Sequence, residues 1–324
     1  MMATALSFWI LPCAWALDAL LGEPPSRLHP LCVAGIWARR TERFWKARFG
    51  KTLVAGALAA LSAVFPGVAL AAGTAWSATF GPAWLPGLCC ALWAAFAMAP
   101  RSLAEHARCV LDAALRGDDT GSKRAVSMIV GRDTELLDHA GVLRSAIESV
   151  SENLTDGVLS TLFWAAAGWV MGGPVGSATA VVLHRLVNML DAMWGKKNDE
   201  YRRFGTFAAR ADDVLNYLPA RLSLVLIAAA ACLLPGMNGR RALLVGWKYR
   251  HAHASPNSAW SEAAFAGALG LKLGGPVSYK GMKADYPFIG DGRLAARAVD
   301  LARAVLLMRA ATVLGVAVAA CAFL

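Results

Sequence analysis

The sequence predicts an all-α, polytopic integral membrane protein with broken or re-entrant helices and a helical cytoplasmic face. Hydrophobic residues make up 57% of the 324 residues, and charged residues only 17%. The charges are unevenly distributed, because the stretches 52–100, 157–184 and 222–238 contain no Asp, Glu, Lys or Arg. Uncharged stretches of this length are typical of segments inside a bilayer and exclude an ordinary soluble domain. We expect residues 1–324 to form a single membrane-embedded domain.

The distribution of Lys and Arg predicts how the chain is oriented. These residues outnumber Asp and Glu by 32 to 22, which gives a formal net charge of +10. All of them except Arg309 lie in polar blocks between the apolar segments. By the positive-inside rule these blocks are cytoplasmic. The predicted cytoplasmic blocks are 22–51, 101–157, 185–221 and 239–303.

The first apolar segment, 1–21, has no positive charge ahead of it, and basic residues begin only at Arg27. This arrangement predicts an uncleaved membrane anchor whose N-terminus lies outside. The tripeptide Ala14-Trp15-Ala16 resembles a cleavage site, so a signal peptide is the alternative.

Three further spans are predicted by length and composition. The uncharged run 52–100 can cross the bilayer twice, through 52–75 and 84–100, with the Gly- and Pro-rich residues 81–87 as the turn. The last apolar run, 304–324, carries only Arg309 near its start and is expected to span outward.

The two remaining apolar segments, 158–184 and 222–238, have cytoplasmic charge at both ends, so neither can be an ordinary single crossing. Gly172-Gly173-Pro174 interrupts the first segment, which predicts a helical hairpin or a re-entrant pair of half-helices. The second segment is at the short limit for a span and ends with Leu234-Pro235-Gly236. Broken helices are tolerated in a membrane where they are buried or line a cavity. We therefore expect these segments to form the walls of a site that opens to the cytoplasm.

The first group of candidate site residues precedes the broken segment. On a helix, Glu148, Ser149, Glu152, Asn153 and Asp156 fall within an arc of roughly 140°. Like charges four residues apart destabilise a helix, and a hard cation with oxygen ligands would offset this. The predicted metal ligands are therefore the three carboxylates and Asn153. A solvated helix face is the alternative interpretation.

A second group follows the broken segment. Arg185, Asn188 and Asp191 recur every three residues and share one side of a helix. Lys196 and Lys197 come next, as point charges suited to phosphate. Interfacial lysines that extend toward lipid headgroups are the alternative for the two lysines.

A third group lies just before the short apolar segment. Asp212 and Asp213 stand four and three residues ahead of Asn216, so both carboxylates can approach the same amide and a cation. Pro219 favours the start of a half-helix, and Arg221 follows it. A simple helix cap is the alternative.

A fourth group surrounds a turn signal at residues 255–257. Ser255 and Asn257 flank a proline, and a helix start is predicted at Ser258 or Ser261. His253 precedes the turn. Helix capping alone is the alternative explanation for these polar residues.

Together these motifs resemble the CobD/CbiB family of membrane proteins of cobalamin biosynthesis, the adenosylcobinamide-phosphate synthases. The resemblance covers nearly the whole chain, with the motifs in the right order. It departs from the family at Gly22-Glu23-Pro24, where the family usually has Gly-Asp-Pro. The matching segments are 149–157, 188–195, 212–221, 255–260, 262–270, 273–275 and 290–292.

The resemblance implies a ligase in the bacterial cytoplasmic (inner) membrane that forms an amide bond. Its substrates would be the corrinoid adenosylcobyric acid and the amino-alcohol phosphate (R)-1-aminopropan-2-ol phosphate, and its product adenosylcobinamide phosphate. ATP and Mg²⁺ would serve the reaction, through an acyl phosphate. The other expected partners are the lipid bilayer and either a second copy of the chain or other membrane enzymes of the pathway. No nucleic acid is expected.

Roles for the candidate residues follow from this chemistry, which brings a triphosphate, a carboxylate and a phosphorylated amine together. The carboxylates of Glu148, Glu152 and Asp156 with Asn153 would hold magnesium-bound phosphates. The substrate- and phosphate-binding candidates are Arg185, Asn188, Lys196, Lys197, Asn216, Arg221, Ser255 and Asn257. The catalytic candidates, including the base that deprotonates the amine, are Glu152, Asp156, Asp191, Asp213 and His253.

Two other functions stay open at this point. A corrinoid transporter could use the same broken helices and polar groups, although the sequence shows no paired repeats. A non-catalytic accessory membrane protein is the second alternative, and the density of polar motifs argues against it.

Overall fold

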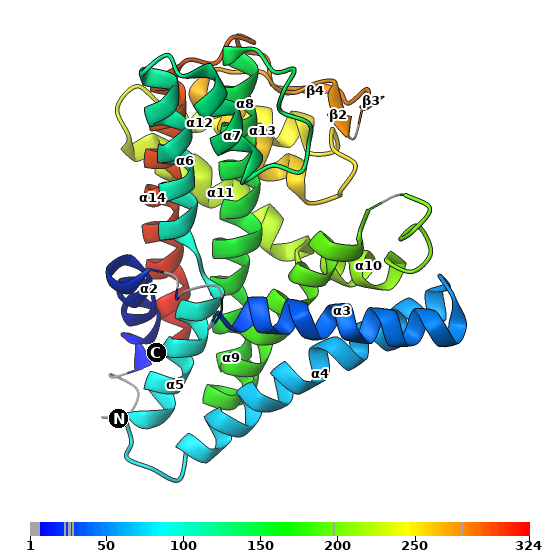
Figure 1. The fold of residues 1–324 in the computed structure, drawn as a ribbon. Helices are drawn as coiled ribbons and strands as arrows, with labels where there is room; N and C mark the ends of the chain where they lie inside the picture. Colours follow the sequence, from blue (N-terminus) through cyan, green and yellow to red (C-terminus); the bar gives the residue numbers. More distant parts are fainter. Residues whose placement is uncertain (1–6, 23, 25–26, 28, 197, 280) are drawn as a thin grey trace. The chain divides into compact units, whose positions relative to one another are not determined.

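The structure is a computed structural model that describes residues 7–22, 24, 27, 29–196, 198–279 and 281–324. The chain forms two compact units, each assembled from segments distant in sequence (Figure 1). Unit 1 comprises Met1–Ala99, Ser160–Asn216 and Val316–Leu324, and unit 2 comprises Pro100–Leu159 and Tyr217–Gly315. That the whole chain forms one membrane-embedded domain stays a prediction.

Helices dominate both units, which confirms the predicted all-α fold. In unit 1, apolar helices pack through small residues, as in many membrane proteins. Its elements are α2 (Ile10–Leu21), α3 (Pro30–Phe49), α4 (Leu53–Ala78), α5 (Leu85–Ala97), α9 (Ser160–Trp194), α10 (Thr206–Leu215) and the 3₁₀ turn η2 (Cys321–Phe323).

Unit 2 contains shorter helices and two small antiparallel strand pairs, β1 with β4 and β2 with β3. Its helices are α6 (Pro100–Leu115), α7 (Asp119–Ser127), α8 (His139–Asn153), the π-helix η1 (Leu154–Leu159), α11 (Tyr217–Leu233), α12 (Gly239–Tyr249), α13 (Ser258–Leu269) and most of α14 (Ala298–Ala320). Its strands are β1 (Leu273–Gly274), β2 (Val277–Tyr279), β3 (Met282–Ala284) and β4 (Phe288–Ile289).

Four short strands interrupt the helices of unit 2. They lie in the predicted cytoplasmic block 239–303, between α13 and α14. Glycines and prolines recur through residues 274–290, and such residues interrupt a helix. Gly274 shows the requirement directly, because its φ of 67° is unfavourable for other residues and an added Cβ would lie 2.8 Å from the Pro287 carbonyl oxygen.

Four helical stretches among the described residues are long and apolar enough to cross a membrane, or five if the bent pair α10 and α11 counts as one. The stretches Leu53–Ala78 and Ala298–Phe323 cover the predicted spans 52–75 and 304–324, and that they cross a membrane stays a prediction. The apolar helical stretch at the predicted span 84–100 runs Leu85–Leu115, with a brief break at residues 98–99. The prediction for 1–21 is only partly testable, since residues 1–6 lie outside the described part.

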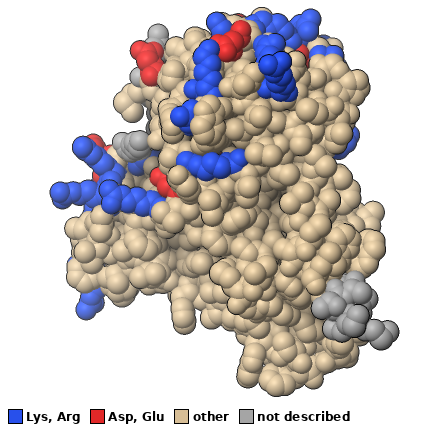
Figure 2. All heavy atoms as spheres, turned by 180° about the vertical axis from the view of Figure 1, so that it is seen from behind, with Lys and Arg blue, Asp and Glu red and all other residues tan. Residues whose placement is uncertain are grey.

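Figure 2 shows one face of the molecule with the charged side chains coloured. Its lower part, where α4 and α5 of unit 1 lie in Figure 1, carries almost no Lys, Arg, Asp or Glu. The run 52–100 contributes no charged side chain to this surface, as expected for helices that face lipid.

The break predicted in segment 158–184 is present in α9. Gly172 and Gly173 have non-helical dihedral angles, and Gly173 has a φ of 57°, which favours glycine. Beyond the break the chain turns back, because a Cβ added at Gly168 would lie 2.4 Å from the carbonyl oxygen of Gly176. Eight residues of continuous helix would separate these positions by about 12 Å. The segment is therefore a helical hairpin, the first of the two predicted forms.

Close packing of the two arms predicts a large effect of any side chain at Gly168. We expect Gly168→Val to destabilise the detergent-solubilised protein by more than about 1–3 kcal/mol, because the new side chain meets backbone atoms that cannot move aside. The measurement is the thermal unfolding midpoint. Gly172→Ala is the matched control, since an added Cβ there meets nothing within 4 Å. Equal midpoints for the two variants would contradict the hairpin packing.

The second predicted broken segment, 222–238, begins earlier than expected. The helix α11 starts at Tyr217, directly after a break at Asn216, so Pro219 lies in its first turn as predicted. The helix ends at Leu233, before the Leu-Pro-Gly sequence. Asn238 then caps α12 by accepting a hydrogen bond from the Arg241 amide at 2.8 Å.

Candidate functional site

The structure divides the candidate residues between the two units. Unit 1 contains Arg185, Asn188, Asp191, Lys196, Asp213 and Asn216, and unit 2 contains Glu148, Glu152, Asn153, Asp156, Arg221, His253, Ser255 and Asn257. Lys197 lies outside the described residues, as does Glu23.

In unit 2, Glu148 on α8 is buried and its carboxylate is fully engaged. One oxygen (Oε2) lies 2.7 Å from the Arg132 guanidinium. The other (Oε1) accepts a hydrogen bond from the Gly274 amide at 2.6 Å and lies 4.0 Å from Arg144. These contacts join α8 to β1 and to the loop that carries Arg132. Removing one partner of such a buried pair would leave an uncompensated charge.

Glu152, one turn further along α8, contacts the turn motif of α13. Its Oε1 accepts a hydrogen bond from the Ser258 hydroxyl at 3.0 Å. Ser258 is the first residue of α13, so the serine predicted as a helix start also positions a candidate carboxylate. The neighbouring Asn153 is exposed and turns back on its own helix, donating to the Ser149 carbonyl at 2.9 Å.

The polar helix face ends in an irregularity that the sequence did not indicate. Residues Leu154–Leu159 form a π-helix, and Asp156 lies within it. Single π-helical turns occur frequently at functional sites, because the extra residue changes the direction of the side chains that follow. Thr155 in this turn is buried, and its hydroxyl has no hydrogen-bond partner among the described residues.

Glu262 on α13 is a further acidic residue of this region, which was not among the candidates predicted from the sequence. It is 5% exposed. Burial raises its pKa well above the usual range, and the charges of Glu152, Glu148 and Asp156 act in the same direction, against the nearby Arg132. Four acidic side chains thus share one neighbourhood in unit 2. We call Glu148, Glu152, Asp156 and Glu262 the acidic cluster.

The raised pKa of Glu262 predicts a pH dependence of stability. Between the unfolded value of 4.5 and the folded value, the native state holds one proton more than the unfolded state. Stability therefore decreases as pH rises through this window, by about 1.4 kcal/mol per pH unit. Glu262→Gln should remove this slope, which thermal unfolding midpoints measured from pH 5 to 8 would show. A slope equal to that of the unmodified protein would mean that Glu262 is charged throughout.

Arg221, on α11, contacts the same turn motif through Asn257. Its Nη1 donates to the Asn257 side-chain oxygen and to the Tyr217 carbonyl, both at 2.8 Å. Its guanidinium carbon lies 3.5 Å from the centre of the Tyr217 ring and 4.9 Å from that of Trp260. A guanidinium held by two hydrogen bonds and two aromatic rings is pre-oriented for binding an anion.

Ser255 and His253 fold back on the turn itself. The Ser255 amide donates to the His253 Nδ1 at 3.0 Å, and the Asn257 amide donates to the Ser255 hydroxyl at 3.3 Å. Because a backbone amide always donates, Nδ1 of neutral His253 carries no proton and Nε2 carries it. In this geometry the neutral ring offers a hydrogen-bond donor at Nε2. This disfavours the predicted role of His253 as a base.

A separate buried network occupies unit 1. Asn216, at the break after α10, accepts hydrogen bonds from Ser160 at 2.7 Å and from His184 at 2.9 Å. Its amide nitrogen donates to Asp212 at 3.0 Å, and Asn188 donates to the same carboxylate oxygen at 3.2 Å.

Arg185 extends this network from the neighbouring position on α9. Its Nη1 donates to the Asn188 side-chain oxygen at 3.1 Å. Arg185 thus donates to Asn188, which in turn donates to Asp212, so this chain of hydrogen bonds links α9 to α10. The predicted pairing of Asn216 with an acidic residue is confirmed for Asp212.

The remaining candidates of unit 1 are Asp191, Asp213 and Lys196. Asp191 lies against Gly195, where an added Cβ would be 2.0 Å from the carboxylate. Asp213 is half-buried on α10, and Lys196 is exposed just after α9. Their functional roles stay predictions.

The carboxylates of the acidic cluster are the candidate ligands for Mg²⁺ in unit 2. Among the described residues, no three His, Cys, Asp or Glu side chains are placed to hold an ion by themselves. Mg²⁺ is commonly bound by one or two carboxylates together with substrate phosphates. Glu152 and Asp156 fit this mode, whereas both oxygens of Glu148 are engaged elsewhere. The residues therefore suit an ion held largely by phosphate.

Sequence reasoning missed Arg132, Gly274 and Glu262 as parts of the site. Arg132 and Gly274 are far from Glu148 in sequence, so only the tertiary fold reveals their contacts. A signal was present for Glu262, which is the one charged residue within 254–271. A single acidic residue in a buried helix is an indication of function.

Comparison with known proteins gives consistent matches along the chain. A family model described as CobD/Cbib protein matches residues 11–308. The "Cobalamin biosynthesis protein CobD" of Citrobacter koseri is 38% identical over 315 residues, which cover 94% of this chain and 93% of that protein. The "Cobalamin biosynthesis protein CbiB" of Salmonella typhimurium is 38% identical over 321 residues with the same coverage. No solved structure matches the chain.

Proposed function

The chain belongs to the CobD/CbiB family, and we propose that it serves cobalamin biosynthesis as an ATP-dependent amide ligase. It joins adenosylcobyric acid to (R)-1-aminopropan-2-ol phosphate and gives adenosylcobinamide phosphate. The enzyme works in the bacterial inner membrane with its site facing the cytoplasm. The observation that carries the proposal is that the acidic cluster and Arg221 contact the same turn before α13, through Ser258 and Asn257. This turn therefore combines carboxylates and a fixed cation in unit 2.

The reaction proceeds in two balanced steps. The carboxylate of adenosylcobyric acid attacks the γ-phosphorus of ATP, which forms an acyl phosphate and releases ADP. The amine nitrogen then attacks the acyl carbon, the bond from carbon to the phosphate oxygen breaks, and inorganic phosphate leaves. The amine arrives as an ammonium ion, so one proton passes to a base before the attack, and the second proton that the nitrogen loses on forming the amide leaves with the phosphate.

The base is a carboxylate of the acidic cluster. The contact between Ser255 and His253 places the proton of neutral His253 on Nε2, so this ring offers a donor. Glu152 is half-buried and reaches the start of α13, where it is positioned by Ser258. It therefore accepts the proton of the ammonium group, and Glu262, held neutral by its surroundings, does not compete for it.

Positive side chains bind the phosphate groups. Arg221 is held by Asn257 and two aromatic rings and binds a phosphate of a substrate in unit 2. In unit 1, Lys196 supplies further positive charge for phosphate. Asp156, together with the ATP phosphates, would hold Mg²⁺, which would supply charge neutralisation for phosphoryl transfer.

Trapping the intermediate tests this mechanism. Full-length protein in nanodiscs is incubated with adenosylcobyric acid, ATP, Mg²⁺ and hydroxylamine, without the amino-alcohol phosphate. The expected products are a corrinoid hydroxamate and ADP in equal amounts, because hydroxylamine attacks an acyl phosphate. Formation of AMP in place of ADP would show an acyl adenylate and contradict the proposed first step.

A further inference from the structure

The helix α3 of unit 1 presents three different faces. Small side chains, including Ala38, pack against the rest of the unit. A second face exposes large apolar residues, with Val33 54%, Trp37 42% and Phe44 57% exposed. A third face carries basic residues. A helix with adjoining apolar and basic exposed faces is typical of the membrane interface.

An apolar pocket of about 630 Å³ lies beside this helix, between α3, α4, α5 and α9. Its volume is within the range of pockets that bind small molecules. Two tryptophans in its wall have their N–H groups already satisfied. Trp37 donates to the Ser62 carbonyl and Trp93 donates to the Thr74 hydroxyl, both at 3.0 Å. They therefore offer apolar ring surface to an occupant.

Among the described residues, the charged ones that line this pocket are two arginines, Arg40 from α3 and Arg185 from α9. Arg185 is fixed by its hydrogen bond to Asn188, as described above. Arg40 makes no ion pair among the described residues. An apolar pocket whose described lining contains two arginines and neither Asp nor Glu suits an amphiphile with an apolar body and a negatively charged group.

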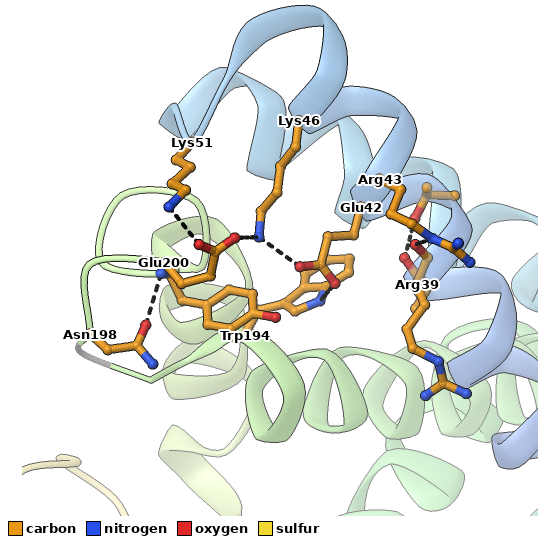
Figure 3. Close-up of polar contacts among 11 residues, drawn as sticks. Arg39, Glu42, Arg43, Lys46, Lys51, Trp194, Asn198 and Glu200 are labelled. Atoms are coloured by element: carbon orange, nitrogen blue, oxygen red, sulfur yellow. Dashed lines mark hydrogen bonds and ion pairs between the residues drawn. The ribbon is translucent and has the colours of Figure 1, made fainter.

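At the C-terminal end of α3, in contrast, the positive charges of the lysines are paired with carboxylates. There Lys46 lies 2.6 Å from Glu42 and 2.7 Å from Glu200, and Lys51 lies 2.5 Å from Glu200 (Figure 3). These hydrogen bonds lower the pKa of Glu200 to about 2, so the cluster stays paired at neutral pH.

The carboxylates of that cluster do not reach the other basic residues of the helix. Arg39 and Arg43 extend away from the carboxylates in Figure 3 and, like Arg40, make no ion pair with any described residue. Three arginines on one exposed face therefore lack a negative partner within the described part of the chain. They lie beside an apolar surface continuous with the pocket, since Val33 and Trp37 contribute to both.

We propose that this pocket binds an anionic phospholipid of the surrounding bilayer. The acyl chain occupies the apolar pocket, and the phosphate group contacts Arg40 and Arg185. A lipid is favoured as the occupant because two walls, α4 and α5, come from the uncharged run 52–100, which is expected to face the bilayer. Its negative charge matches the unpaired arginines of α3.

Native mass spectrometry of the delipidated full-length protein in detergent tests the proposal. Phosphatidylglycerol and phosphatidylcholine with identical acyl chains are added separately, and their apparent dissociation constants are compared. Phosphatidylglycerol should bind more tightly by about fivefold for each contributing arginine. Arg40→Gln should reduce this preference about fivefold, and Arg40→Lys should retain part of it. Leu70→Trp, at an exposed position of the pocket wall, should weaken binding of both lipids.

The matched control is Arg48→Gln, which removes an exposed arginine of the same helix that does not line the pocket. It should leave the preference for phosphatidylglycerol unchanged. Equal binding of the two lipids, or equal effects of Arg40→Gln and Arg48→Gln, would overturn the proposal. Displacement of phosphatidylglycerol by adenosylcobyric acid would assign the pocket to the substrate and overturn it as well.

Discussion

Replacing Glu152 by Gln is expected to lower the turnover number for amide formation by about 10²-fold or more, the usual contribution of a positioned acid or base. The substitution keeps the size of the side chain and an oxygen that can accept the hydrogen bond from Ser258. It removes the negative charge and the ability to take a proton from the substrate ammonium group. The measurement is the initial rate of adenosylcobinamide phosphate formation by full-length protein in nanodiscs.

Glu135→Gln is the matched control for this substitution, because Glu135 is an exposed glutamate of the same unit. It should leave the rate within twofold of the unmodified protein. A pH-rate profile separates two explanations, since loss of a base removes the acidic limb of the profile whereas misplacement of substrate does not. Full turnover by a well-folded Glu152→Gln protein would contradict the assignment of this carboxylate to the reaction.

Arg221→Lys is expected to lower kcat/KM by about 10- to 10²-fold, although the positive charge is retained. Lysine cannot stack flat on the Tyr217 ring and donate to Asn257 in the same fixed orientation. The loss should appear chiefly in the KM for the phosphate-bearing substrates if Arg221 binds phosphate in the ground state. Steady-state kinetics with each substrate varied in turn provides the measurement.

Two variants sharpen this second prediction. Arg240→Lys changes an exposed arginine of α12 in the same unit and should leave kcat/KM unaltered. Asn257→Ala removes the partner of Arg221, so its effect and that of Arg221→Lys should be markedly less than additive when combined. Additive effects would show that Asn257 does not act through Arg221.

Much of the fold could be predicted from the sequence, because bilayer residence leaves a strong pattern in it. The spans 52–75 and 304–324 follow from the absence of charge, and the hairpin break follows from Gly172-Gly173-Pro174. The end of the third span could not be placed in this way. Helical structure continues through 100–115 even though charged residues begin at Arg101, and charge density does not report where a helix ends.

The candidate site was predictable to the extent that its contacts are local. Asn216 with Asp212 and Arg185 with Asn188 are neighbours on a helix, and spacing alone brings them together. The contacts of Glu148 with Arg132 and Gly274 depend on tertiary packing of the loop and β1 against α8. The neutral state favoured for Glu262 could not be foreseen either, because it results from burial and from carboxylates on another helix.

The central claim is that the chain is an amide ligase acting on a corrinoid. Complete turnover tests it most directly, with full-length protein in nanodiscs supplied with adenosylcobyric acid, (R)-1-aminopropan-2-ol phosphate, ATP and Mg²⁺. Mass spectrometry should detect adenosylcobinamide phosphate, and omission of ATP or Mg²⁺ should abolish it. Corrinoid that binds to the protein and is recovered unchanged under the complete conditions would contradict the claim and indicate a carrier or accessory role.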